Sequence, residues 1–113
     1  MKQICVTGLG YIGLPTSSIL AAKGYQVLGV DVSRKVVDTI NSGKIHITEP
    51  DLDLFVRAAV QSGKLRASLA PEKSDVFIIA VPTPFKEDKK PDMSFVQAAT
   101  ESLVKFLQPG NLV

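Results

Sequence analysis

Gly8-Leu9-Gly10-Tyr11-Ile12-Gly13 is the stretch that decides the fold, because its three glycines follow the spacing G-x-G-x-x-G. Before it, Gln3–Thr7 is rich in β-branched residues, as expected for a buried parallel strand. After it, Gly13–Lys23 predicts a helix that tolerates Pro15 in its first turn and stops at Gly24. The glycines are therefore predicted to form a tight turn from a strand into a helix.

The alternation of strands and helices continues beyond this turn. Gln26–Val30 predicts a second strand, and Ser33 is the expected N-cap of a second helix that Gly43 ends. A third helix is expected next, with Thr48 and Asp51 as a capping box and Pro50 in its first turn. Its predicted apolar stripe consists of Leu52, Phe55, Val56 and Ala59.

The second half of the chain repeats the pattern. Leu65–Leu69 and Val76–Val81 predict two more strands, and Asp92 or Ser94 is expected to cap a last helix. Strands that alternate with helices indicate an α/β fold, in which a doubly wound parallel sheet of the Rossmann type carries helices on both faces. Such a sheet binds its ligands at the carboxyl ends of the strands.

The glycine spacing also predicts a ligand. Gly8 allows the tight turn, Gly10 lets the backbone approach a pyrophosphate, and Gly13 lets the helix pack closely on the strand. The phosphates would then face the free N–H groups and the positive dipole end of the helix near Tyr11 and Ile12. The sequence thus predicts dinucleotide binding, although glycine clusters also serve plain turns.

An acidic residue supports this interpretation and bears on the cofactor. Asp31 lies 23 residues after Gly8, at the end of the second predicted strand, where an acidic side chain accepts hydrogen bonds from ribose hydroxyls. Its carboxylate would repel a 2′-phosphate, which favours NAD over NADP. Arg34 and Lys35 follow closely and offer a charge for that phosphate, but a solvated first helical turn explains them better.

Composition places the chain among soluble globular proteins. Its 113 residues suffice for one domain, and a net charge of +2 points to neither nucleic acid nor an anionic membrane as partner. The longest strongly apolar run is Val76–Val81, far short of the roughly 20 residues of a membrane helix. The single cysteine fits a reducing compartment, so a cytoplasmic protein is expected. No metal site is predicted, since His46 is the only histidine.

The end of the chain predicts an incomplete domain. Pro109-Gly110 closes a helical segment, and Asn111–Val113 resembles the first residues of a strand. We therefore expect residues 1–113 to be one Rossmann domain that is truncated at its C-terminus.

Four segments resemble the UDP-sugar 6-dehydrogenases, a family that includes the UDP-glucose and UDP-N-acetylmannosamine enzymes. These segments are "GLGYIGLP" at 8–15, "GVD" at 29–31, "IHITEPDL" at 45–52 and "VPTP" at 81–84. The resemblance covers essentially the whole chain. The stretch from Gly43 to Asp53, together with "VPTPF", is more similar to the UDP-N-acetylmannosamine branch.

The resemblance implies an enzyme of nucleotide-sugar metabolism and polysaccharide biosynthesis. Members oxidise the C6 alcohol of a UDP-sugar to a carboxylate with two NAD⁺ and a cysteine nucleophile. The implied NAD contacts are Gly8, Gly10, Tyr11, Ile12, Gly13, Asp31 and Thr83. Thr83 would also be the one residue near the chemistry, through a catalytic water or the nicotinamide.

The remaining family features fall outside residues 1–113. The catalytic cysteine, the dimer-forming segment and the UDP-binding domain of the family lie further along the chain, so a homo-oligomer is expected only of the longer protein. Cys5 is predicted to be a buried strand residue and not the nucleophile.

Two alternatives stay open from the residues alone. One is the NAD domain of another two-domain dehydrogenase, of the hydroxyacid or hydroxyacyl-CoA type. The other is a regulatory domain that senses NAD without chemistry. Neither explains the "VPTP" segment at 81–84.

Overall fold

The computed structural model describes residues 3–81 and 93–113. The elements, in chain order, are β1 (Gln3–Thr7), α1 (Gly13–Ala22), β2 (Gln26–Val30), α2 (Arg34–Asn41), α3 (Leu52–Gln61), β3 (Leu65–Ser68), β4 (Val76–Ile79), α4 (Ser94–Leu103) and the 3₁₀ turn η1 (Val104–Phe106). The predicted alternation of strands and helices is confirmed in this order.

The strands form one parallel sheet in the order β3-β2-β1-β4. This is the first part of the strand order 3-2-1-4-5-6 of dinucleotide-binding folds. Thr7 pairs with Val30 on one side and with Ile79 on the other, so three strands end level with one another. From β1 the chain adds β2 and β3 on one side of the sheet and then crosses to add β4 on the other side of β1. Folds of this type bind their ligands at this switch point between β1 and β4.

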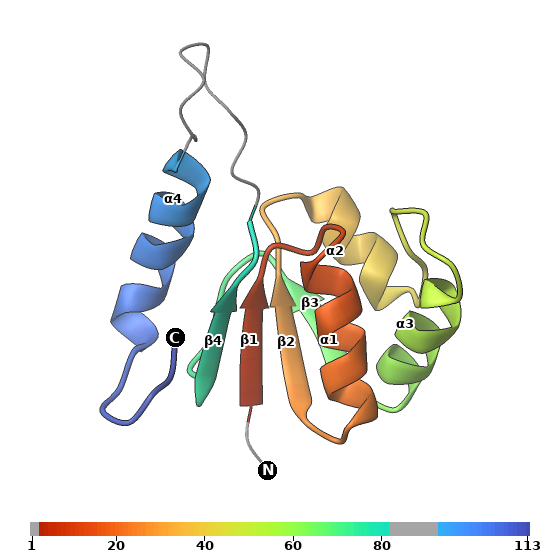
Figure 1. Ribbon diagram of the computed structural model, residues 1–113, viewed down its shortest axis with the longest axis horizontal. Coiled ribbons are helices and arrows are strands. Elements are labelled where there is room, and N and C mark those ends of the chain that lie inside the picture. The colour runs from red at the N-terminus through yellow and green to blue at the C-terminus, as the bar shows by residue number, and fades with distance from the viewer. Residues whose placement is uncertain (1–2, 82–92) are drawn as a thin grey trace.

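Helices cover both faces of the sheet (Figure 1). On one face α1, α2 and α3 bury a core that includes Ile4, Val6 and Val27. On the other face the alternate strand residues Cys5, Leu28 and Phe77 pack with Leu103 of α4. The predicted doubly wound α/β fold is confirmed.

The predicted start of α3 is wrong, and of the two caps considered for α4 one is wrong and the other is not described. α3 begins at Leu52, so Pro50 precedes it, and no side chain caps its first turn. Asp51 takes the N-cap position with a left-handed φ of 63°, a conformation outside any capping box with Thr48. Ser94 is likewise the first residue of α4 and not its cap, while Asp92 lies outside the described residues.

Phe55 departs from the predicted stripe of α3. Its side chain is 51% exposed, whereas Leu52, Val56 and Ala59 are buried as predicted. The buried positions are four and three residues apart and suffice for one helical face.

The last residues, for which the sequence predicts the start of a strand, form an isolated bridge beside β4. Val76 and Leu112 form a parallel bridge, in which the N–H of Phe77 donates to the Leu112 carbonyl over 2.8 Å. No helix in the described ranges, 3–81 and 93–113, is long and apolar enough to cross a membrane.

Candidate dinucleotide site

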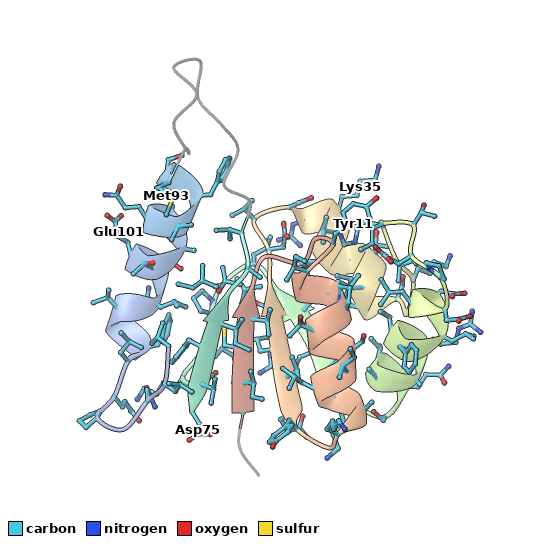
Figure 2. The ribbon with its side chains drawn as sticks, in the orientation of Figure 1. Tyr11, Lys35, Asp75, Met93 and Glu101 are labelled. Carbon is cyan, nitrogen blue, oxygen red and sulfur yellow. The ribbon has the colours of Figure 1, made fainter. Side chains whose placement is uncertain are left out.

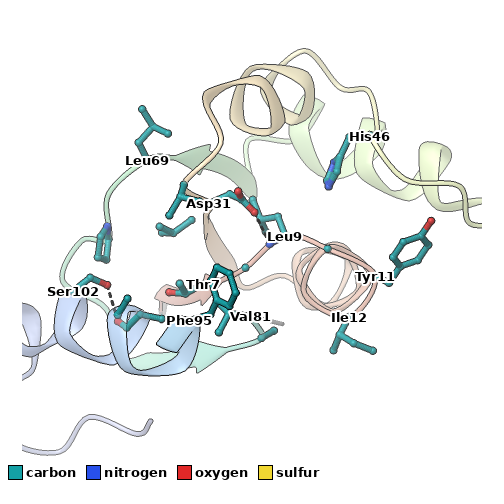
Figure 3. Close-up of a pocket in the computed structure, with 18 residues that line it drawn as sticks. Thr7, Leu9, Tyr11, Ile12, Asp31, His46, Leu69, Val81, Phe95 and Ser102 are labelled. Atoms are coloured by element: carbon teal, nitrogen blue, oxygen red, sulfur yellow. Dashed lines mark hydrogen bonds between the residues drawn. The ribbon is translucent and has the colours of Figure 1, made fainter. Parts of the chain in front are cut away.

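A cavity of about 770 Å³ lies at the carboxyl ends of the strands (Figure 3). Its walls come from the glycine turn, the end of β2, the connection between α2 and α3, the connection between β3 and β4, and α4. Figure 2 shows the Tyr11 side chain at this end of the sheet, at the far end of the strands from Asp75. The volume is within the range of ligand pockets.

The three glycines of the turn meet different surroundings. Gly8 has a φ of +97°, and a Cβ there would lie 2.7 Å from the Ala80 carbonyl oxygen. A Cβ on Gly13 would collide with the carbonyl oxygen of Gly8. A Cβ on Gly10 would have no heavy atom within 4 Å. Gly8 and Gly13 are thus required by the backbone itself, whereas Gly10 keeps a space open beside the cavity.

The N-terminus of α1 offers unpaired backbone donors at that space. Its first hydrogen bond runs from the Leu14 N–H to the Gly10 carbonyl over 3.0 Å, and no side chain caps the helix. Among the described residues, the N–H groups of Tyr11 and Ile12 have no hydrogen-bond acceptor. The first turn carries no acidic side chain that would repel an anion. This end of the helix fits a phosphate group.

Asp31 links the glycine turn to the end of β2. Its Oδ2 accepts from the Leu9 N–H at 3.1 Å, and its Oδ1 accepts from the Ser33 N–H at 2.9 Å. A carboxylate has about four acceptor positions. The side chain is only partly buried and lines the cavity, so it holds the turn and still has lone pairs for a ligand.

The side of the cavity next to α4 is apolar, and the sequence patterns did not reveal it. Val32 is 95% exposed directly after Asp31, and it faces the same cavity as Leu69, Pro71, Phe95 and Ala98. The position of Val32 at the site could have been predicted from the sequence, because Val32 directly follows Asp31. The others come from a connection and a helix that are far away in sequence, so no local pattern could assign them.

Thr7 is a further residue that the motifs missed. It is 8% exposed and lines the cavity, and its Oγ1 has no hydrogen-bond partner among the described residues. The hydroxyl oxygen is itself buried, so Thr7 forms part of the cavity wall and is not a contact that the structure offers to a ligand.

Cys5 is confirmed as a buried strand residue with no exposed surface. Burial raises the pKa of its thiol to about 11. A thiol that stays protonated is a poor nucleophile. Within residues 3–81 and 93–113, no group of three His, Cys, Asp or Glu side chains could hold a metal ion.

The sequence also matches a known family over nearly its whole length. The family model described as "UDP-glucose/GDP-mannose dehydrogenase family, NAD binding domain" covers residues 2–113. The chain belongs to this dehydrogenase family. NAD is therefore its cofactor, which confirms the prediction made from the position of Asp31.

Individual relatives of the family are similar to this chain at more than half of their aligned positions. The NDP-N-acetyl-D-galactosaminuronic acid dehydrogenase of Ralstonia nicotianae is 54% identical over 112 residues, which are 99% of this chain and 26% of the relative. The UDP-N-acetyl-D-mannosamine dehydrogenase of Escherichia coli K12 is 54% identical over 110 residues, which are 97% of this chain and 26% of the relative.

A solved structure of the same family has the same fold. The UDP-N-acetyl-mannosamine dehydrogenase of Staphylococcus aureus superposes with a TM-score of 0.95 at 47% identity, over 97% of this chain and 27% of that one. The chain thus spans about a quarter of the length of these dehydrogenases.

The structure describes six of the seven site residues that the family resemblance implies. Gly8, Gly10, Tyr11, Ile12 and Asp31 all line the cavity, and Gly13 supports the turn from behind. Thr83 lies outside the described residues. Among the basic residues after Asp31, Arg34 and Lys35 are exposed and do not line the cavity, in agreement with a solvated first turn.

Proposed function

We propose that this chain is the NAD-binding domain of a UDP-sugar 6-dehydrogenase that oxidises UDP-N-acetylmannosamine to its uronic acid with two NAD⁺. The observation that carries the proposal is the open space at Gly10, which faces the unpaired N–H groups of Tyr11 and Ile12 beside the carboxylate of Asp31. Each of these groups suits one part of a dinucleotide.

The residues divide the binding among themselves. The N–H groups of Tyr11 and Ile12 would hold the pyrophosphate, with Gly10 allowing its close approach. Asp31 would accept hydrogen bonds from the adenosine ribose, and the apolar wall at Val32 and Phe95 suits the flat adenine. NAD⁺ supplies the oxidising power of the reaction, and these side chains and N–H groups hold and orient it.

Thr83 is proposed to contact the nicotinamide or a catalytic water, because it follows β4 closely in sequence and β4 ends at this edge of the sheet. The catalytic cysteine is proposed to lie beyond residue 113, since Cys5 is buried in β1. The UDP-sugar would bind through a C-terminal domain, and the longer protein would be a cytoplasmic homo-oligomer of nucleotide-sugar metabolism and polysaccharide biosynthesis.

The identity of the sugar is the most specific element of the proposed activity. It rests on the segments at 43–53 and 81–85 and on the names of relatives such as the Escherichia coli enzyme. A second candidate is a nucleotide-linked N-acetylgalactosamine sugar, because the Ralstonia nicotianae relative has the same identity of 54%.

The test is to supply the full-length protein with NAD⁺ and, in separate reactions, UDP-N-acetylmannosamine, UDP-N-acetylgalactosamine or UDP-glucose. The proposal expects NADH from the first sugar at two NADH per sugar consumed, together with the uronic acid by mass spectrometry. NADH from UDP-N-acetylgalactosamine alone would establish the second candidate. Binding of NAD⁺ with no oxidation of any UDP-sugar would favour a sensor domain.

A further inference from the structure

His46 lies in the connection between α2 and α3, in a segment whose neighbours fix its direction. Ile45 and Ile47 are partly buried and pack against the core on the α1 face of the sheet. His46 between them is exposed and lines the cavity (Figure 3). The two isoleucines on either side thus hold this bend of the chain against the core, and the imidazole between them is left at the cavity.

The imidazole lies on the same side of the cavity as the glycine turn. Figure 3 shows His46 projecting from its connection toward the part of the cavity bordered by Leu9, Asp31 and Tyr11. That part includes Gly10, whose missing side chain leaves the space open.

The charges of the cavity give His46 a distinct place. Among the described lining residues, Asp31 carries the only negative charge and His46 is the only basic side chain. A dinucleotide adds a negatively charged pyrophosphate beside that carboxylate, and the backbone N–H groups of Tyr11 and Ile12 approach it from the α1 side alone. An imidazole N–H from the α2–α3 connection would approach it from the opposite side.

We propose that His46 is a further binding residue of this site, whose imidazole N–H donates to the phosphate oxygens of the dinucleotide above Gly10. This inference rests on the proposed cofactor site and adds a residue to it. His46 makes no hydrogen bond or ion pair with the other described residues, so no polar contact among them explains its position.

The test measures binding to the full-length protein by calorimetry with NAD⁺, ADP-ribose and adenosine as probes. His46→Ala should lower the affinity for NAD⁺ and for ADP-ribose about tenfold, the loss expected when a hydrogen bond to a charged group is removed. Adenosine, which has no phosphate, should bind the variant as it binds the unchanged protein. His46→Gln keeps an N–H donor and should recover part of the lost affinity.

Lys44→Ala is the matched control, because Lys44 is exposed in the same connection and does not line the cavity. Its affinity for all three probes should equal that of the unchanged protein. Wild-type affinity of His46→Ala for NAD⁺ would overturn the inference, and so would an equal loss for adenosine, which would assign the ring to the base. Failure of the unchanged protein to bind NAD⁺ would instead contradict the proposed function.

Discussion

Replacing Gly13 by alanine tests why the turn needs its third glycine. The added Cβ would collide with the carbonyl oxygen of Gly8 and would touch the Ala80 Cβ at 3.4 Å. Neither side of the collision moves easily. The Gly8 N–H donates to the Val30 carbonyl over 2.7 Å, and α1 is anchored by buried residues such as Leu14 and Ser17.

The magnitude follows from two opposing effects. Overpacking a rigid site costs about 1–3 kcal/mol, and occasionally more. Alanine recovers up to about 1 kcal/mol of helix propensity over glycine, and less in a first turn. Because the collision is with a backbone atom, we place Gly13→Ala at the upper end, with a net loss of about 2 kcal/mol in the free energy of unfolding. Urea denaturation of the 113-residue chain measures it.

Gly10→Ala is the control with the opposite profile. Its Cβ would meet nothing within 4 Å, so stability should be unchanged or raised by less than about 1 kcal/mol. The same methyl group would fill the space kept for the pyrophosphate, so NAD⁺ should bind at least about tenfold more weakly. Equal stability of Gly13→Ala and the unchanged chain, or full NAD⁺ affinity of Gly10→Ala, would refute the division of roles among the glycines.

Three more predictions concern single side chains. Asp31→Asn should weaken the binding of NAD⁺ about tenfold and lower the ratio of the affinities for NAD⁺ and NADP⁺, both measured by titration. An unchanged ratio of these affinities would contradict the contact between Asp31 and the ribose. Burial raises the pKa of the Cys5 thiol from 9.0 to about 11 in the folded chain, so the unfolded chain loses this proton first. Its contribution to stability is intact below about pH 9 and falls by roughly 2 kcal/mol toward pH 11, a decline that denaturation of Cys5→Ala should lack. Arg66 pairs with Glu72 at 2.6 Å on a half-exposed surface and lowers the pKa of the Glu72 carboxyl, so the pair stabilises above the ordinary carboxyl pKa and loses its effect in acid. Arg66→Ala should therefore lower the free energy of unfolding by less than about 1 kcal/mol at neutral pH and by nothing measurable once Glu72 is protonated, and a larger loss at neutral pH would argue against the screening of this pair.

The fold was accessible from the sequence because its patterns are local. Periodicity and glycine positions predicted the strands Gln3–Thr7 and Gln26–Val30 to the residue. Ser33 was predicted as an N-cap from its residue type, and its hydroxyl accepts from the Val36 N–H. The start of α3 was not predictable in this way, since the left-handed backbone of Asp51 replaces a side-chain cap.

Only part of the candidate site can be predicted from the sequence. The groups that follow β1 and β2 directly, such as Gly10 and Asp31, were predicted because a known spacing joins them. Thr7 directly precedes Gly8, but the glycine motif assigns it no role. His46 and Phe95 reach the cavity through tertiary packing, and no spacing relates them to the glycine turn. The segment around His46 is anchored to the core by Ile45 and Ile47, two residues that belong to no motif.

A crystal structure of the protein with NAD⁺ would show directly whether the glycine turn and Asp31 hold the cofactor. We expect the pyrophosphate within hydrogen-bond distance of the Tyr11 and Ile12 N–H groups and above Gly10, with a ribose hydroxyl on the carboxylate of Asp31. NAD⁺ bound elsewhere, or bound in the cavity with its phosphates away from the start of α1, would contradict it.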